Sequence, residues 1–220
     1  MDFFTQLVLT IGKITPNGIK LLGSGFLITN DGRVATTRHV VGDEDKNLVI
    51  LYPHIDKIDT YQDTTDNKCN PIPVQITEAD PFRDLVILQS PLQFHGKIPE
   101  IGSFDSTKIG DTVGIFGFPH CTEGRRVLTF QNAEIGAKIL LESNSIKSKY
   151  AVINTQARPG QSGSLVFCPR TQKIVGILIG AFIPKGGRGI SLGGISPREL
   201  HQTTHCISAE YLQSMLEGDN

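Results

Sequence analysis

The feature of this 220-residue chain that most constrains its fold is a succession of short apolar and β-branched runs, separated by turn sequences. Such runs are typical of strands, and a turn such as Asn30-Asp31-Gly32 connects two strands of a hairpin. Many short strands at close spacing favour antiparallel barrels or sandwiches, so we expect an all-β fold. The runs that we predict as strands are 6–14, 19–29, 34–37, 48–52, 74–77, 85–89, 112–116, 126–135, 150–154, 164–167, 174–182 and 189–195.

The pattern of runs divides the chain into two halves of about six strands each. The segment 92–111 is rich in Pro and Gly, which is typical of a connection. We therefore expect one folded unit over residues 1–220, with its first half over about 1–98 and its second half over about 99–206.

The C-terminal segment is predicted to form a helix at about 207–217. Ser208 can cap its start, and Gly218 follows its end. Apolar residues recur there at helical spacing, so we expect one face of the helix to pack on the body of the protein. These residues are Ile207, Tyr211, Leu212, Met215 and Leu216.

Composition and charge narrow the function classes. Hydrophobic residues make up 39% of the chain and charged residues 20%, which suffices for a core and excludes a disordered chain. Lys and Arg total 21 against 22 for Asp and Glu, so we expect no nucleic-acid partner. No apolar run approaches the roughly 18 residues of a membrane helix, so no membrane span is expected. The basic segments 138–149 and 185–188 are interpreted as solvated loops.

The N-terminus and the cysteines bear on the compartment. Residues 1–13 show neither the basic start nor the cleavage site of a secretory signal. Without an export signal, free thiols are favoured over disulfides at Cys69, Cys121, Cys168 and Cys206. We therefore expect a cytosolic (cytoplasmic) protein.

Three segments carry side chains that suit nucleophilic catalysis. His39 follows a predicted strand, Asp84 directly precedes one, and Ser162 lies in a glycine-flanked loop. Each residue alone has an ordinary structural explanation. Together they supply what a hydroxyl nucleophile requires: a base that takes its proton, an acid that orients the base, and a loop whose N–H groups can face an oxyanion.

With these motifs in this order, the chain resembles a chymotrypsin/trypsin-fold serine protease of the HtrA-like branch that lacks disulfides. The resemblance covers about residues 6–217, and the order His, Asp, Ser matches that family. It implies two antiparallel six-stranded β-barrels with the catalytic residues in the cleft between them, followed by the C-terminal helix. We expect no PDZ domain in this chain. The motifs are Gly23-Ser24-Gly25-Phe26, His39-Val40-Val41, Asp84-Leu85-Val86, Gly110 to Pro119, and Pro159-Gly160-Gln161-Ser162-Gly163.

The resemblance also implies roles for individual residues. Ser162 would attack the scissile carbonyl, His39 would act as general base and then general acid, and Asp84 would stay ionised and orient His39. The oxyanion hole would be formed by the loop Gly160-Gln161-Ser162, with the N–H groups of Gly160 and Ser162 as donors. Asp80, four residues before Asp84, is an alternative acid.

Two positions depart from the family pattern. Gln161 stands where digestive proteases carry the Asp that a newly cut N-terminus contacts, so activation by N-terminal cleavage is not expected. Ser164 replaces a glycine next to the nucleophile, which favours an alternative in which the protein is catalytically latent.

The substrate pocket is expected to be apolar and to take a small or medium side chain. The resemblance assigns its walls to Ala157 before the nucleophile and to Leu178, Ile179, Gly180 and Ala181 on a later strand. That strand would also present an edge to an extended peptide. Zinc ligation by His201, His205 and Cys206, or by His120 and Cys121, lacks the usual ligand spacing, so we expect no metal and no cofactor.

The sequence thus predicts a serine endopeptidase (a hydrolase) that cuts protein or peptide substrates through an acyl-enzyme and is regulated by a protein partner. The alternative is a latent or inactive protease-like module that binds extended peptides without cutting them. Neither the oligomeric state nor the physiological substrate follows from the sequence.

Overall fold

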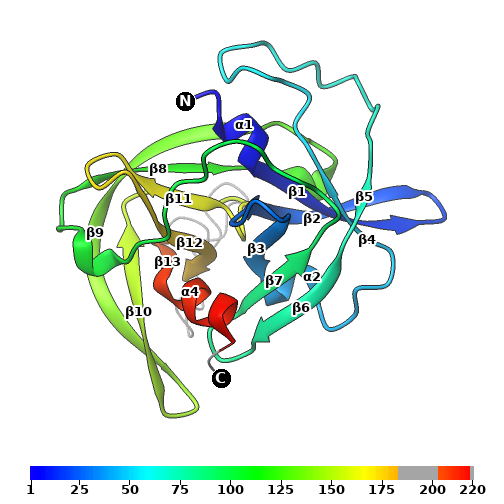
Figure 1. Ribbon diagram of the computed structural model, residues 1–220. Helices are drawn as coiled ribbons and strands as arrows, with labels where there is room; N and C mark the ends of the chain where they lie inside the picture. Colours follow the sequence, from blue (N-terminus) through cyan, green and yellow to red (C-terminus); the bar gives the residue numbers. More distant parts are fainter. Residues whose placement is uncertain (183–202, 219–220) are drawn as a thin grey trace, which may run out of the picture.

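The computed structural model describes residues 1–182 and 203–218, and shows two β-rich halves packed side by side (Figure 1). The first half is a strongly curved antiparallel sheet with the strand order β5-β4-β1-β2-β3-β7-β6. Two one-turn helices, α1 (Phe4–Leu7) and α2 (Arg38–Val41), flank it. The strands are β1 (Val8–Thr15), β2 (Gly18–Leu27), β3 (Arg33–Thr37), β4 (Leu48–Leu51), β5 (Ile72–Pro73), β6 (Gln75–Asp80) and β7 (Leu85–Gln89).

The prediction of a closed six-stranded barrel in the first half is wrong. Its seven strands form an open half-barrel, and β5 and β6, which follow one another in the chain on either side of Val74, lie at its two opposite ends. β5 pairs with β4, and β6 pairs with β7 at the other end of the sheet. Pro73 has no N–H to donate to a ladder. Across this junction, the Val74 N–H donates to the Leu48 carbonyl at 3.1 Å.

The second half is a closed antiparallel barrel with the order β10-β13-β12-β11-β8-β9, as predicted. Its last strand, β13, was not predicted; the strand expected at 189–195 lies outside the described residues. Two 3-10 turns, η1 (Phe104–Ser106) and η2 (Cys121–Glu123), flank β8. The strands are β8 (Thr112–Gly117), β9 (Thr129–Ser143), β10 (Ile146–Ile153), β11 (Leu165–Cys168), β12 (Lys173–Phe182) and β13 (Thr203–Ser208).

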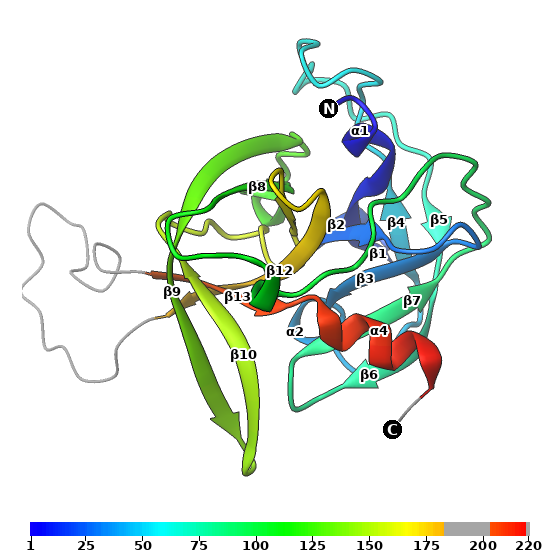
Figure 2. The ribbon, with the colours of Figure 1, turned by 60° about the vertical axis from the view of Figure 1, so that its left-hand side comes forward.

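The interpretation of segment 138–149 as a solvated loop is also wrong. The segment is the far end of the β9–β10 hairpin, which projects beyond the barrel (Figure 2). The tip residues Asn144 and Ser145 have φ of 48° and 67°, as a tight hairpin turn requires. Leu140 and Leu141 are exposed there, so the strand lacks the alternation of buried and exposed residues that marks a strand on a core. The second basic segment, 185–188, lies outside the described residues.

The predicted C-terminal helix is present as α4 (Glu210–Glu217) and begins later than expected. Ser208 does not cap it, because Ser208 ends β13 and its hydroxyl accepts a hydrogen bond from the Phe104 N–H at 3.2 Å. The helix crosses to the first half and lies against β6 and β7, with Leu212 and Met215 buried (Figure 2).

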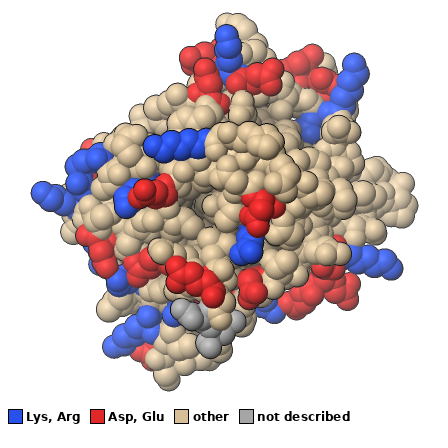
Figure 3. All heavy atoms as spheres, viewed as in Figure 1, with Lys and Arg blue, Asp and Glu red and all other residues tan. Residues whose placement is uncertain are grey.

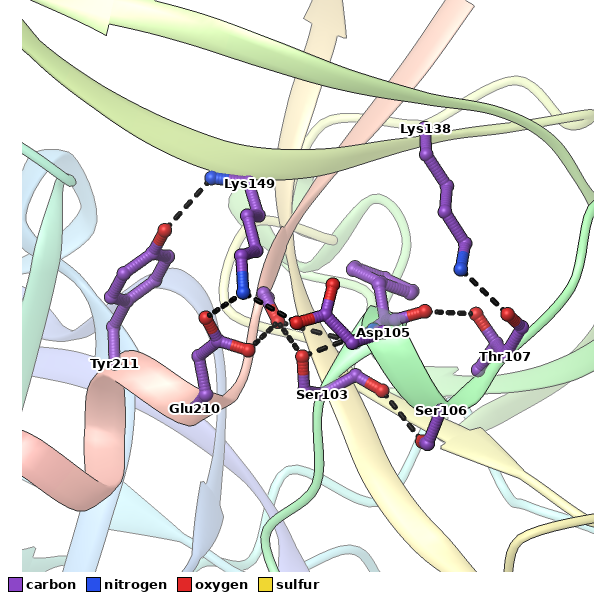
Figure 4. Close-up of polar contacts among 10 residues, drawn as sticks. Ser103, Asp105, Ser106, Thr107, Lys138, Lys149, Glu210 and Tyr211 are labelled. Atoms are coloured by element: carbon purple, nitrogen blue, oxygen red, sulfur yellow. Dashed lines mark hydrogen bonds and ion pairs between the residues drawn. The ribbon is translucent and has the colours of Figure 1, made fainter.

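Polar contacts attach the start of α4 to the second half (Figure 4). The Lys149 backbone N–H donates to the Tyr211 hydroxyl at 2.8 Å. The Lys149 ammonium contacts Glu210 at 3.0 Å and Asp105 at 2.5 Å. The helix is thus rooted on the barrel while its apolar face covers the open sheet.

Three further features are the surface charge, the length of the helices and the state of the cysteines. Figure 3 shows acidic and basic side chains interspersed over the face it displays. Within residues 1–182 and 203–218, no helix is long and apolar enough to cross a membrane. All four cysteines are free, Cys69 exposed and the other three buried.

Candidate active site

The structure places His39 and Asp84 side by side through the pairing of β3 with β7. Thr37 lies opposite Leu85 in this ladder, so the residue groups that follow β3 and precede β7 meet at the same end of the sheet. His39 Nδ1 lies 2.5 Å from Asp84 Oδ2, and the His39 backbone N–H donates to Asp84 Oδ1 at 2.9 Å. The carboxylate therefore favours the tautomer that keeps a proton on Nδ1 and leaves Nε2 as an acceptor.

The backbone around Asp84 is shaped for this contact. Asp84 has φ of 59°, a left-handed conformation that Asp tolerates better than most residues. The Asp84 carbonyl accepts the Arg38 N–H at 2.9 Å. The alternative acid, Asp80, instead accepts the N–H groups of Phe82 and Arg83 and pairs with the Arg83 guanidinium at 2.7 Å. Asp80 thus shapes the loop, and Asp84 contacts the histidine.

Ser162 lies at the tip of a tight turn between β10 and β11. The Gln161 N–H donates to the Arg158 carbonyl at 3.0 Å, and the Gln161 side chain is buried and accepts the Arg158 N–H at 2.7 Å. The Gln161 N–H is therefore used inside the turn and is not a free donor. Gln161 stands at the position where digestive proteases carry an acid, and its side-chain amide hydrogen-bonds within its own turn.

Two other N–H groups of this turn have no acceptor within residues 1–182 and 203–218. Among the described residues, no hydrogen bond involves the N–H of Gly160 or that of Ser162. Gly160 has φ of +91° and Gly163 has φ of +85°, conformations that glycine adopts readily. Two unpaired N–H groups, one on the serine and one two residues before it, are what an oxyanion site requires.

The Ser162 hydroxyl donates to the Ile179 carbonyl on β12 at 2.9 Å. Within the part of the chain that the structure describes, no hydrogen bond joins Ser162 to His39. Ile179 is the extra residue of an irregularity in the β12–β13 ladder between Leu178 and Gly180. In this arrangement the hydroxyl points at the strand and must rotate before His39 can take its proton.

Close backbone contact brings the nucleophile loop of the second half against the first half. A Cβ placed on Gly163 would lie 2.0 Å from the Ser24 carbonyl oxygen. A Cβ on Gly23 would lie 2.7 Å from Val40, next to His39, and 3.1 Å from the Ser162 carbonyl oxygen. The glycines of both motifs are therefore needed for the approach that gathers His39, Asp84 and Ser162 at one place.

The residues assigned to the substrate pocket divide into two groups. Ala157 and Leu178 are buried in the core of the barrel, so only their backbone can meet a substrate. Ile179, Gly180 and Ala181 follow on β12, and Gly180 and Ala181 pair with β13 through one edge. Beside the Ser162 turn is a cavity of about 470 Å³. Its walls are Pro119, Thr129, Phe130, Gln131, Thr155, Gln156, Arg158 and Gln161.

The side chain of Ser164, the departure next to the nucleophile, points at Gly117 on β8. A Cβ on Gly117 would lie 1.8 Å from Ser164 Oγ, so the side chain occupies the space that Gly117 leaves open. The hydroxyl is buried and has no hydrogen-bond partner among the residues that the structure describes. Replacing the usual glycine has therefore not displaced the turn.

The sequence analysis missed Ser24, a residue whose side chain hydrogen-bonds to the backbone of this turn. Ser24 is fully buried, donates to the Gly160 carbonyl at 2.8 Å and accepts the Phe118 N–H at 2.9 Å. Its place between two glycines in the first motif was the available signal.

Burial raises the pKa of the neighbouring Cys121 thiol to about 12, so this group stays protonated at neutral pH.

Metal ligation finds no support in the described residues. No group of three or more His, Cys, Asp or Glu in residues 1–182 and 203–218 could hold a metal ion. His120 contacts Glu123 at 3.4 Å, and Cys206 is buried in the barrel. His201 lies outside the described residues.

Residues 23–177, well over half of the chain, match the family described as "Trypsin-like peptidase domain". The chain belongs to the trypsin-like peptidase family. Its curated relatives include proteins named "Probable periplasmic serine endoprotease DegP-like". The one from Rickettsia conorii is 26% identical over 176 residues, and the one from Pseudomonas putida is 27% identical over 173 residues. These matches cover 78% and 76% of this chain and span 30% of each relative's length.

Solved structures show the same fold for this trypsin-like peptidase. The MamO protease domain from Magnetospirillum magneticum has a TM-score of 0.66 at 16% identity, covering 94% of each chain. The HtrA-type protease AlgW with a decapeptide has a TM-score of 0.66 at 18% identity, covering 96% of this chain and 64% of that one. The relatives named DegP-like confirm the resemblance to HtrA-like serine proteases, and the family match confirms that the domain is of the trypsin-like peptidase class.

The prediction of a cytosolic protein is contradicted by these relatives, which are named periplasmic. It rested on the first residues of the sequence and on unpaired cysteines. Neither observation decides the compartment of a trypsin-like peptidase whose match spans 30% of its relatives' length.

Proposed function

We propose that the chain hydrolyses peptide bonds through an acyl-enzyme formed on Ser162. The observation that carries this proposal is the 2.5 Å contact between His39 Nδ1 and Asp84 Oδ2, on the wall that faces the Ser162 turn. In the reaction, Ser162 Oγ bonds to the substrate carbonyl carbon while its proton passes to His39 Nε2. That proton then goes to the leaving amine as the peptide bond breaks, and Asp84 stays ionised and stabilises the imidazolium.

Charge develops on the substrate's carbonyl oxygen in the tetrahedral intermediate. The N–H groups of Gly160 and Ser162, which have no acceptor among the described residues, are the donors we assign to it. A donor that is already oriented needs no rearrangement at the moment of reaction, and loss of one typically costs about 10²–10³ in rate. Water then attacks the acyl-enzyme with His39 again as base, releasing the acid product and restoring Ser162.

The substrate we propose is an extended polypeptide that pairs with β12 at Ile179. The HtrA-type protease AlgW, whose structure was solved with a decapeptide and with a tripeptide, shares the fold and supports peptide binding here. A pairing peptide would present an N–H to the Ile179 carbonyl and compete with the Ser162 hydroxyl for it. Peptide binding would in this way release the nucleophile toward His39.

The Ser162–Ile179 hydrogen bond also favours a second candidate, the latent module that binds peptides without cutting them. The two candidates differ in whether the hydroxyl ever reaches His39. Regulation by a protein partner fits both, because a partner that reshapes β12 would act on the same bond.

We propose the periplasm of the named relatives as the compartment. The buried thiols of Cys121 and Cys206, whose pKa burial raises, would resist oxidation there. Fractionation of the native cells tests this location, and recovery only with cytoplasmic markers would contradict it.

Labelling with a fluorophosphonate serine probe tests the proposal. We expect the wild-type chain to be labelled, the labelling to vanish in Ser162→Ala and His39→Ala, and to fall in Asp84→Ala. An uncleavable extended peptide that binds only along β12 should raise the rate at which the probe labels the wild-type chain. A folded wild type that binds peptide and is never labelled would establish the latent module instead.

A further inference from the structure

We propose that Ser24 is a positioning residue that holds the oxyanion turn of the second half from a strand of the first half. This inference rests on the proposed peptidase activity, since it concerns the same turn. Ser24 itself touches no substrate, because it is fully buried behind the turn.

The turn is exposed to one specific failure, a flip of a peptide next to Gly160. A peptide's C=O and N–H point in opposite directions, so the carbonyl's partner decides where the N–H points. The Pro159 carbonyl accepts the His120 N–H at 2.6 Å, which directs the Gly160 N–H to the opposite side. A flip would replace that donor with a carbonyl oxygen, and the oxyanion would meet a negative dipole.

The next peptide is held by Ser24. Its hydroxyl donates to the Gly160 carbonyl at 2.8 Å and accepts the Phe118 N–H at 2.9 Å. Fixing the Gly160 carbonyl directs the Gln161 N–H into the turn, where it donates to Arg158. Consecutive peptides on both sides of Gly160 are therefore held by groups outside the turn.

Ser24 can position the turn because hydrogen bonds fix its own backbone. Its backbone N–H donates to the Ser162 carbonyl at 2.9 Å, and its carbonyl accepts the Thr36 hydroxyl at 2.7 Å. Ser24 also lies in the β1–β2 ladder opposite Thr10. One residue thus contacts the backbone on both sides of Gln161 and belongs to the half that carries His39 and Asp84.

Ser164 provides a matched control. It is also a fully buried serine beside Gly117, and within the described part of the chain its hydroxyl has no hydrogen-bond partner. Removing that hydroxyl leaves no group of the described residues unpaired, whereas Ser24→Ala takes away the partner of the Phe118 N–H and leaves the Gly160 carbonyl with only the Cys121 thiol, at 3.7 Å. The two substitutions remove the same atoms and differ in what those atoms bond.

The experiment compares wild type, Ser24→Ala, Ser24→Cys and Ser164→Ala in fluorophosphonate labelling rate and in peptide cleavage, with kcat expressed per titrated active site. We expect Ser24→Ala to lower kcat and the labelling rate by about 10- to 100-fold with KM within about twofold, because a displaced oxyanion donor acts in the transition state. Ser24→Cys, which keeps a weaker donor, should fall between Ala and Ser. Ser164→Ala should stay within about twofold of wild type.

Each outcome bears on the inference. A merely structural role would lower the number of titrated sites and leave kcat per site unchanged, which overturns the proposal, and so does a rise in KM alone. If Ser24→Ala is too unstable to assay, Ser24→Cys with wild-type kcat would overturn it as well. A well-folded wild type that is neither labelled nor active would instead sink the proposed function, and this inference with it.

Discussion

The two halves of the molecule solve the same packing problem in different ways. The barrel closes on itself and holds a separate core of its own, which includes Phe104, Ala151 and Cys206. The open sheet shares its core with the other half: one continuous cluster runs from Leu7 and Ile87 through Phe116 to Leu212 and Met215. A closed ladder has no free edge and encloses its own interior, whereas an open sheet needs other elements to cover it.

This difference explains how the catalytic residues are distributed. The barrel supplies Ser162 and the oxyanion turn, and the open sheet supplies His39, Asp84 and the supporting Ser24. Ser162 can react with the help of His39 only if the two halves keep their relative position. The shared core and the helix α4, which is attached to the barrel and packs on the open sheet, hold the halves in that position (Figures 2 and 4).

The largest effect is expected from removing the charge that the open sheet contributes to the site. Asp84→Asn should lower kcat by about 10⁴, because the amide no longer favours the proton on His39 Nδ1 or stabilises the imidazolium. Asp80→Asn is the control, since Asp80 contacts its own loop rather than His39, and it should stay within about tenfold. Steady-state cleavage of a peptide substrate provides the measurement, and equal losses in both variants would contradict the assignment.

Next in size is a disruption of the contact between the halves. Gly163→Ala places a Cβ 2.0 Å from the Ser24 carbonyl oxygen at a φ of +85°, so we expect about 3 kcal/mol or more of lost stability and no labelling. Gly124 has a φ of +86° with open space around its Cβ position. Gly124→Ala therefore isolates the cost of the backbone conformation, about 1–2 kcal/mol. Urea denaturation of the pair gives the difference; similar midpoints would show that the halves can move apart freely.

The covering role of the helix can be tested on the open sheet alone. Leu212→Ala should cost about 2–4 kcal/mol, as is usual for a fully buried leucine. Hydrogen exchange should quicken in β6 and β7, which the helix contacts, more than in the closed barrel. Leu216→Ala, at a partly buried position on the same helix, should have a smaller effect. Uniform acceleration through both halves would mean that they unfold as one unit.

The smallest effect concerns the titration of groups buried in the second half. Burial raises the pKa of Cys121 from 9.0 to about 12 and that of Tyr150 from 10.0 to about 12. The unfolded chain then loses protons above about pH 9 that the folded chain retains, so stability is complete below that pH and falls as the pH rises toward 12. Each such thiol or phenol contributes up to about 1.4 kcal/mol per pH unit. Denaturation midpoints at pH 8, 9 and 10 should fall, and less steeply in Cys121→Ala; a flat profile would refute the burial of these groups.

The sequence by itself determined the elements whose local chemistry is unambiguous. Alternating strands, the turn at Asn30-Asp31-Gly32 and the order of His39, Asp84 and Ser162 indicated the family and the division into halves. It did not indicate that the first barrel stays open, because the turn at Val74 depends on which strands meet there. It also gave no sign of the β9–β10 extension, whose exposed leucines lack a buried face.

Tertiary structure alone decided how the site is held. Ser24 and Ser162 are far apart along the chain. A serine's sequence context does not reveal whether its hydroxyl bridges two backbone groups, as in Ser24, or has no hydrogen-bond partner among the described residues, as in Ser164. The Ile179 carbonyl became a partner of the nucleophile only through an irregularity in the β12–β13 ladder. Residue types specify which groups can react, because that chemistry is local. Their orientation depends on non-local backbone contacts that form only when the two halves pack together.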